Sequence, residues 1–204
     1  QGKVKIIHNA IDLDKFKFNP EARKKLRKEL NIKEKTVVIG HVGRFVSQKN
    51  HDFLINVFNE YHTKNPDSKL LLIGTGPLEE KIKAKVEKLN LTDSVIFLGQ
   101  REDTNKFYSV MDVFCLPSLY EGLPVVGVEA QAAGLLCLFS NNITPDIYIN
   151  KLKSKLLPLE LESWVLNDVV YSRNPNEQEN TFSKSNFNIK HNAKTILDFY
   201  LKKI

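Results

Sequence analysis

Short apolar runs alternate with amphipathic segments along most of this chain. Three of the runs, VVIGHV, LLLIG and LLCLF, carry almost no polar residue. A strand that is apolar at every position is typical of a sheet buried on both faces, whereas a half-solvated strand alternates. Amphipathic helices between such strands act as crossovers, which favours parallel pairing. The sequence therefore predicts an α/β fold, a doubly wound, Rossmann-like parallel sheet with helices on both faces.

The expected elements follow one another in regular alternation. Strands are expected at Val4–His8, Thr36–Val42, Lys69–Ile73, Val95–Leu98, Val113–Leu116, Leu135–Phe139 and Leu156–Leu159. Two helices are expected to begin at Asn19-Pro20 and at Asn50. Further helices are expected to span Pro77–Leu89, Thr104–Val110, Pro124–Ala133, Glu162–Val170 and about 188–203. Asn19 and Asn50 are expected to cap their helices, because an Asn side chain can accept from the free amides of the first turn. The polar stretch Ser172–Ser185 is expected to be a loop.

Length and termini set the expected organisation. The 204 residues suit one domain, 1–204, and no internal boundary is evident. No apolar run approaches the roughly 18 residues that span a bilayer. The chain has no signal-peptide pattern. Because it opens with Gln1-Gly2-Lys3 rather than Met, it is expected to be a piece of a longer protein.

Charge and cysteine content narrow the expected partners. The net charge is +6, and a cluster of cations within Arg23–Lys28 is interpreted as a solvated helix face. Attraction of the full-length protein to an anionic membrane surface is the open alternative. Basic and aromatic residues are not interleaved, so nucleic acid is not an expected partner. Cys115 and Cys137 lie within apolar runs, which predicts buried free thiols and fits a reducing cytoplasm.

Two carboxylates separated by seven residues are the strongest candidates for chemistry. Glu121 precedes an expected helix and Glu129 lies within it. The neighbours of Glu129 on that helix are Val126, Val128, Ala130, Ala132 and Ala133. A helix this apolar should be buried on most sides, where an unpaired charge is costly. Glu129 is therefore expected either to accept hydrogen bonds from sugar hydroxyls or to belong to a structural ion pair.

The segment Gly122-Leu123-Pro124 stands at the N-terminus of the same helix. Free backbone N–H groups and the helix dipole make such a position favourable for an anion. A glycine there lets a ligand approach the backbone closely. An anionic ligand beside Glu121 is the resulting expectation.

The second candidate is the loop from Gly43 to Asn50, where a buried strand ends at a glycine. Arg44 follows at once and Lys49 comes five residues later. Arginine offers a planar fork for phosphate and lysine a mobile point charge. Two cations beside a helix N-terminus can neutralise a diphosphate without a metal. The alternative is a pair of exposed cations on an ordinary loop.

Weaker signals exclude some classes of function. After Gly74-Thr75-Gly76-Pro77, Glu79 stands where a dinucleotide fingerprint needs its third glycine, which disfavours a nicotinamide-dependent oxidoreductase. Asp12-Leu13-Asp14 could hold a metal that binds a nucleotide-sugar, a minor alternative. His41 lies within an expected buried strand and is interpreted as a core residue. Ser118 lacks a nucleophile-elbow context, which disfavours a hydrolase.

Four segments together resemble the donor domain of the family-four glycosyltransferases. They are GRFVSQKN, LLLIGTGP, VIFLGQRED and DVFCLPSLYEGLPVVGVEAQAAG. The likeness covers about Lys3–Thr144, is strongest with bacterial enzymes that build capsular polysaccharides and exopolysaccharides, and extends more loosely to FNIKHNAKTILDFYL. Members of that family are retaining enzymes of GT-B architecture, in which two Rossmann-like domains face each other across a cleft.

The resemblance implies roles for the matching residues. Arg44 and Lys49 would bind the diphosphate, Glu129 the ribose hydroxyls, and Glu121 the hydroxyls of the donor sugar. The implied donor-binding positions are Gly43, Arg44, Lys49, Gly74, Arg101, Gly122, Leu123, Val125 and Glu129. The implied catalytic positions are Glu121, Arg44 and Lys49. No metal and no further cofactor is expected, and a donor phosphate oxygen would help to deprotonate the acceptor.

The resulting expectation is the donor-binding domain of a retaining glycosyltransferase. It would take a nucleotide-diphosphate-sugar, UDP-sugar being favoured, and serve transfer to a polysaccharide or lipid-linked acceptor. The acceptor-binding N-terminal domain is expected to be absent from this chain, which alone should be inactive. The location would be cytoplasmic, with the inner face of the cell membrane as an open possibility.

The sequence departs from the family pattern in places. Asn9-Ala10-Ile11-Asp12 replaces the usual Asn-Gly-hydrophobic-Asp, and Asn141-Asn142-Ile143-Thr144 stands where Gly-Gly is common. Two other functions stay open: a nucleotide-sugar-binding module without transfer activity, and a nucleotide-sugar epimerase of related fold. Intact Glu121, Glu129, Arg44 and Lys49 speak against the first, and release of free epimerised sugar would favour the second.

Overall fold

Six parallel strands form the centre of the protein, in a computed structural model that describes residues 9–164, 166, 173, 182 and 187–201. The strands are β1 (Val37–Val42), β2 (Ser68–Ile73), β3 (Val95–Phe97), β4 (Val113–Leu116), β5 (Leu136–Ser140) and β6 (Ser154–Leu157). Their order is β3-β2-β1-β4-β5-β6, and all neighbours pair in parallel. The chain builds outward from β1 in one direction and then in the other, which confirms the predicted doubly wound sheet.

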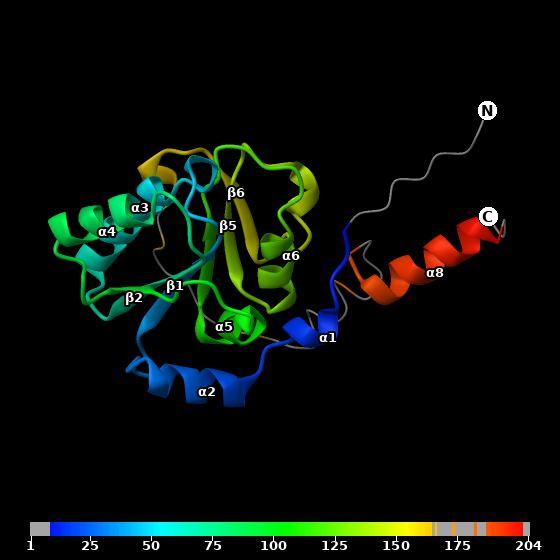
Figure 1. Cartoon of the computed structure of the whole chain (residues 1–204), viewed down its shortest axis with the longest axis horizontal. Coiled ribbons are helices and arrows are strands. Elements are labelled where there is room, and N and C mark those ends of the chain that lie inside the picture. Colours follow the sequence, from blue (N-terminus) through cyan, green and yellow to red (C-terminus); the bar gives the residue numbers. More distant parts are fainter. Residues whose placement is uncertain (1–8, 165, 167–172, 174–181, 183–186, 202–204) are drawn as a thin grey trace.

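Helices cover both faces of this sheet (Figure 1). The α-helices are α1 (Leu13–Phe16), α2 (Pro20–Glu29), α3 (His51–Lys64), α4 (Glu79–Lys88), α5 (Thr104–Val110), α6 (Val125–Ala132) and α8 (Ile189–Tyr200). Short 3-10 turns are η1 (Ser47–Lys49), η2 (Pro145–Ile147) and η3 (Leu161–Ser163). Helices α3 and α4 pack on one face and α5 and α6 on the other, with α2 against α5. The sheet is thus a middle layer between two helical layers.

Successive strand residues supply the two cores in turn. Val38 of β1 belongs to the core under α5 and α6, and Ile39 to the core under α3 and α4. Phe114 and Cys115 of β4 divide in the same way, and all four side chains are fully buried. Side chains of a strand alternate between its faces, so uninterrupted apolar runs are required where both faces are covered.

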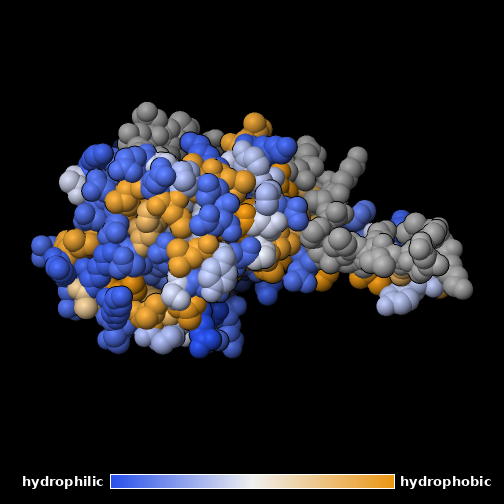
Figure 2. All heavy atoms as spheres, turned by 90° about the horizontal axis from the view of Figure 1, so that it is seen from above, coloured by the Kyte–Doolittle hydropathy of each residue, from blue (hydrophilic) through white to orange (hydrophobic). Residues whose placement is uncertain are grey.

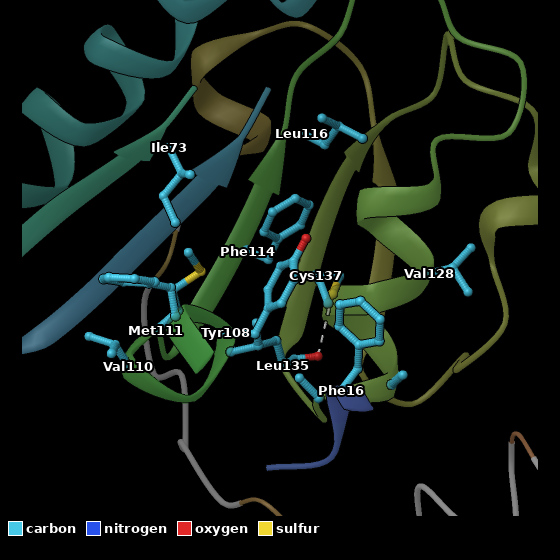
Figure 3. Close-up of a cluster of buried hydrophobic side chains, with 14 of the residues drawn as sticks. Phe16, Ile73, Tyr108, Val110, Met111, Phe114, Leu116, Val128, Leu135 and Cys137 are labelled. Atoms are coloured by element: carbon cyan, nitrogen blue, oxygen red, sulfur yellow. Dashed lines mark hydrogen bonds between the residues drawn. The ribbon is translucent and has the colours of Figure 1, made fainter. Parts of the chain in front are cut away.

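The core under α5 and α6 is drawn in Figure 3. Phe114 and Leu116 enter it from β4, Cys137 from β5, Tyr108 from α5 and Val128 from α6. Cys137 and the other cysteine are free and buried, as the sequence predicted. The ring of Tyr108 lies in this core, and its hydroxyl donates to the carboxylate of Glu129 in α6 at 2.7 Å.

Two arginines of α2 correct the expectation of a fully solvated cationic face. Arg27 is 2% exposed and donates to Asp112 at 2.7 Å, and Arg23 reaches the other carboxylate oxygen of Asp112 at 2.8 Å. Asp112 also accepts from the backbone N–H of Val38 at 2.8 Å. Burial lowers the pKa of Arg27, although Asp112 opposes the shift. The 3.6-residue periodicity indicates a charged helix, but it cannot indicate that the buried carboxylate of Asp112 lies against two of its arginines.

The two predicted helix caps have different outcomes. The Asn19 side chain accepts from the amide of Ala22 at 2.9 Å, so the expected cap of α2 is confirmed. Asn50 precedes α3, but its side chain makes no capping hydrogen bond. Its backbone is left-handed, with φ of 54°, a conformation that asparagine tolerates. The expected side-chain cap at Asn50 is therefore wrong, and the residue serves the turn between η1 and α3.

Other boundaries differ modestly from expectation. The last strand begins at Ser154 rather than Leu156, and the short helix α1, which precedes α2, was not predicted. The expected strand Val4–His8 lies outside the described residues, as do most of Glu162–Val170 and most of Ser172–Ser185. A helix of four residues such as α1 is too short for periodicity to reveal.

The predicted C-terminal helix is present as α8, which extends away from the body of the domain (Figures 1 and 2). The N-terminal end of α8 is hydrogen-bonded to the segment that precedes α1. The backbone N–H of Ile11 donates to the carbonyl of Phe187 at 2.9 Å, and the N–H of Ile189 donates to the carbonyl of Ile11 at 3.0 Å. Leu197 is 57% and Tyr200 78% exposed. An apolar stripe of α8 is thus uncovered. No helix in the described part of the chain is long and apolar enough to cross a membrane.

Candidate functional site

The order of the strands determines where a ligand can bind. The chain reverses its direction of winding at β1, whose neighbours are β2 and β4. Between β1 and β4 the crossovers run to opposite faces, and ligands of doubly wound sheets bind in the crevice outside the strand ends at such a point. Those loops are residues 43–50 and 117–124. They carry the two strongest candidates from the sequence.

An ion pair joins the two loops. Lys49 Nζ lies 2.5 Å from Glu121 Oε1, and both side chains are largely buried, at 16% and 10% exposure. The hydroxyl of Ser118 donates to the same Glu121 oxygen at 2.8 Å. The structure thus brings together two predicted site residues, and it adds Ser118, which the sequence argument had considered only as a nucleophile.

A hollow of about 400 Å³ lies at the carboxyl ends of β1 and β2, lined in part by the loop that carries Lys49. Its lining residues are Val42, Gly43, Arg44, Ile73, Gly74, Thr75, Gln100, Arg101 and Thr104. Arg44 is exposed there, and its guanidinium has no ion pair with any other described residue. Four predicted positions therefore line one hollow, and one of them is a cation available to a ligand.

The shape of the hollow depends on the close approach of two strand ends. Gly74 has φ of 137°, and a Cβ there would lie 2.1 Å from the carbonyl oxygen of Gly43. Phe45 donates to the carbonyl of Thr75 at 3.0 Å, which holds the two loops in register. A side chain at position 74 would therefore push the loop that carries Arg44 away.

Arg101 lies at the rim of the hollow. Its guanidinium pairs with Asp103 at 2.9 Å and stands 5.0 Å from the ring of Phe107. The hydrogen bond to Asp103 raises the pKa of this exposed arginine. Arg101 therefore lines the hollow while its guanidinium is paired within its own loop.

The N-terminus of α6 faces the crevice from the side of β4. Pro124 occupies the N-cap position and offers no capping side chain. Gly122 is exposed, and a Cβ added to it would meet no atom within 4 Å. Leu123 and Val125 are partly buried against the core. This helix end thus presents uncapped amides and an unobstructed glycine, the arrangement that an anion requires.

Glu129 lies one further turn into α6, against α5. Its Oε2 accepts from the hydroxyl of Tyr108 at 2.7 Å, and no ion pair to it is found among the described residues. Burial raises the pKa of the Glu129 carboxyl, and the hydrogen bond from Tyr108 opposes that shift. Tyr108 follows Thr104, which lines the hollow, by one turn of α5, so the helix that lines the hollow also holds Glu129.

Two buried histidines support the first loop from below. His41 Nδ1 donates to the carbonyl of Cys115 at 2.8 Å, and its ring meets that of His51 edge-on at 4.6 Å. A Cβ on Gly43 would come within 2.8 Å of His41 Nε2. Burial lowers the pKa of both imidazoles, that of His51 to about 4. His41 is a core residue as predicted, and His51 was not singled out because its burial depends on Phe45 stacking over it.

Asp12 and Asp14 are engaged in local structure. The Asp12 carboxylate accepts from the amide of Asp14 at 3.1 Å and so caps α1. Asp14 pairs with Lys17 and Lys190, each at 2.8 Å, and these lysines lower its pKa to about 2. Within the described ranges no group of three or more His, Cys, Asp or Glu side chains is arranged to hold a metal ion. The minor metal-site alternative at Asp12–Asp14 gains no support.

Sequence comparison identifies relatives over most of the chain. Residues 22–157 match the family described as "Glycosyl transferases group 1". EpsF of Bacillus subtilis (strain 168) is 40% identical over 145 residues, which are 71% of this chain and 38% of EpsF. The Escherichia coli UDP-Gal:alpha-D-GlcNAc-diphosphoundecaprenol alpha-1,3-galactosyltransferase is 36% identical over 144 residues, 68% of this chain and 37% of that protein. The chain thus spans less than two fifths of these relatives.

Solved structures show the same fold. HepE of Anabaena, in complex with UDP and glucose, has a TM-score of 0.79 at 20% identity over 96% of this chain and 56% of HepE. Sucrose-phosphate synthase of Thermosynechococcus elongatus has a TM-score of 0.81 at 24% identity over 99% of this chain and 53% of that one. The C-terminal domain of the Francisella tularensis glycosyl transferase LpcC has a TM-score of 0.66 at 20% identity and is covered to 93%. By its fold, one Rossmann-like half of a GT-B architecture, and by its sequence, this chain belongs to the group 1 glycosyl transferases.

Proposed function

We propose that this chain is the donor-binding domain of a retaining glycosyltransferase that uses a nucleotide-diphosphate-sugar. The observation that carries the proposal is the meeting of Lys49 and Glu121 at the switch point of the sheet, beside the uncapped N-terminus of α6. A cation and helix amides suit a diphosphate, and a carboxylate next to them suits sugar hydroxyls.

The charges of the site stabilise the leaving group. Negative charge would grow on the diphosphate as the bond to the sugar breaks, and Arg44, Lys49 and the amides of α6 would stabilise that charge. Glu121 would hold the donor sugar through its hydroxyls, and Glu129 the ribose. Transfer with retention would follow if the acceptor oxygen attacks from the same face and loses its proton to a donor phosphate oxygen, because no protein nucleophile is required.

Two of the compared proteins support UDP as the nucleotide, whereas a relative from Mycolicibacterium smegmatis is named for GDP-mannose. The name of the Escherichia coli relative gives UDP-Gal as its donor, and HepE has been solved with UDP and glucose. The hollow lined by Arg44 and Arg101, of about 400 Å³, does not include Glu121 in its lining and would take the base. The proposed donor is therefore a UDP-sugar, bound without a metal or a further cofactor.

The acceptor is proposed to bind to another domain of the full-length protein. Correct positioning of two reactants can lower the activation barrier by roughly 7–11 kcal/mol. The residues proposed for this site bind the donor, so the acceptor needs another surface. The uncovered stripe of α8 around Leu197 and Tyr200 would pack against that second domain. A saccharide or a lipid-linked saccharide is the proposed acceptor, met in the cytoplasm or at the inner face of the cell membrane.

Calorimetric titration with UDP tests the proposal. We expect binding with and without a chelator, and a loss of about 1.5–3 kcal/mol in Lys49→Ala and in Arg44→Ala, because each removes a charged hydrogen bond. Lys88→Ala, at an exposed position of α4, is the matched control and should bind like the parent. Loss of binding on chelation, or equal binding by all four proteins, would refute it.

A further inference from the structure

Two loops that meet at the switch point are joined by a polar clip. The backbone N–H of Leu119 donates to the carbonyl of Gln48 at 2.8 Å, and the Gln48 side-chain amide donates to the carbonyl of Tyr120 at 2.9 Å. Gln48 and Lys49 are neighbours in η1, and Tyr120 directly precedes Glu121. The clip therefore fixes the backbones on which the Lys49–Glu121 pair is mounted.

The fixed backbones do not orient the Glu121 carboxylate by themselves. The terminal torsion of glutamate is broad, and the lysine ammonium is a point charge that can bind either oxygen. The ammonium group of Lys49 would also bind the diphosphate of a donor, which would weaken its contact with Glu121. A directional contact that is independent of Lys49 is therefore needed to keep the carboxylate in one orientation.

Ser118 supplies that contact. Its side chain is fully buried and its hydroxyl donates to Oε1 of Glu121 at 2.8 Å, the same oxygen that Lys49 approaches. Among the described residues no hydrogen-bond donor reaches Oε2. Both protein donors thus occupy one oxygen and leave the lone pairs of the other for a ligand.

We propose that Ser118 is a positioning residue for the donor sugar: it holds Oε1 of Glu121 so that Oε2 accepts a sugar hydroxyl. The inference rests on the proposed function, because it presumes a sugar beside Glu121. It assigns Ser118 no contact with the nucleotide. The sugar moiety should therefore depend on the Ser118 hydroxyl and the UDP moiety should not.

The test compares UDP with UDP-hexoses on this chain. Calorimetry of the parent first identifies which of UDP-glucose, UDP-galactose and their N-acetyl derivatives binds more tightly than UDP. In Ser118→Ala we expect unchanged UDP affinity and a loss of about threefold to tenfold in the affinity for that UDP-hexose, the usual weight of one hydrogen bond. Ser118→Thr keeps the hydroxyl and should restore the preference.

Ser109→Ala is the matched control. Ser109 is equally buried and also uses its hydroxyl in one hydrogen bond, accepted from the Asn19 amide at 3.0 Å, at the far end of α5. It should bind both ligands like the parent. If Ser118→Ala fails to fold, Ser118→Cys, which keeps the side-chain volume and replaces the hydroxyl with a poor donor, is measured instead.

The outcomes separate the two levels of the argument. An unchanged ratio of UDP-hexose to UDP affinity in Ser118→Ala, or an equal loss for both ligands, would overturn the positioning role and leave the proposed function standing. A parent that binds neither UDP nor any UDP-hexose would overturn the proposed function itself.

Discussion

Replacement of Glu129 by glutamine separates binding from stability at the proposed ribose site. Glu129 is partly buried on an apolar helix, and its one polar partner in the described structure is the Tyr108 hydroxyl at 2.7 Å. Burial raises the pKa of this carboxyl, which means that the folded protein holds the charged form at a cost. Glu129→Gln removes the charge and keeps an oxygen that can accept from Tyr108.

The two expected effects have opposite signs. If ribose hydroxyls donate to the carboxylate, its neutralisation should cost about 1.5–3 kcal/mol of binding, or about tenfold to a hundredfold in Kd. The melting temperature should stay level or rise, because a desolvated charge has been removed. A residue kept for structure alone would show the reverse.

The assay is UDP calorimetry together with thermal unfolding followed by circular dichroism. Glu87→Gln, at an exposed position of α4, is the control for loss of one negative charge. Unchanged UDP affinity with a clearly lower melting temperature in Glu129→Gln would show that the carboxylate is structural and refute the reasoning.

Three further predictions concern pH, the buried arginine and transfer. The folded-state pKa of Glu129 lies above its ordinary value, so protonation of Glu129 stabilises the fold below that ordinary value, and this stabilisation is lost as pH rises through the raised pKa. The affinity for UDP-hexose should rise over the same pH interval, because the carboxylate becomes charged. Calorimetry across pH should show this rise in the parent but not in Glu129→Gln, and identical pH profiles would contradict it. Arg27→Ala should lower the free energy of unfolding by about 3–5 kcal/mol, because it removes one of the two arginines paired with buried Asp112 and takes a donor from the carbonyls of Lys33 and Thr36. Exposed Lys28→Ala should change it little; urea unfolding measures both, and equal effects would be inconsistent with a buried pair. The isolated chain should bind donor yet show at most trace transfer to a lipid-linked acceptor extract, and turnover comparable with that of the full-length protein would disprove the need for a second domain.

The sheet was predictable because its signal is local. The run Val37–Val42 is apolar except for His41, and this pattern is typical of a strand that is covered on both faces. The parallel, doubly wound arrangement then follows from the intervening helices. The left-handed turn at Asn50 and the four-residue helix α1 escaped prediction, since neither depends on periodicity.

The candidate site was predictable in its residues but not in its contacts. Lys49 and Glu121 stand out as a cation and a carboxylate next to glycines, but they are 72 positions apart and only the fold shows that they pair. Tyr108 and Ser118 carried no signal of their own, because a buried tyrosine or serine usually serves the core. Their roles depend on which carboxylate the fold places beside each hydroxyl.

Gly122→Ala tests whether the donor binds at the N-terminus of α6. The added methyl group meets no protein atom within 4 Å, so the melting temperature should not change. It projects instead into the space at the N-terminus of α6 that the diphosphate and sugar would fill, where an added methyl should cost about 1–3 kcal/mol. Calorimetry with UDP and the preferred UDP-hexose should therefore show Kd values raised by about fivefold or more in a fully stable variant. Parent-like affinity in Gly122→Ala would contradict the central claim that this crevice is the donor site.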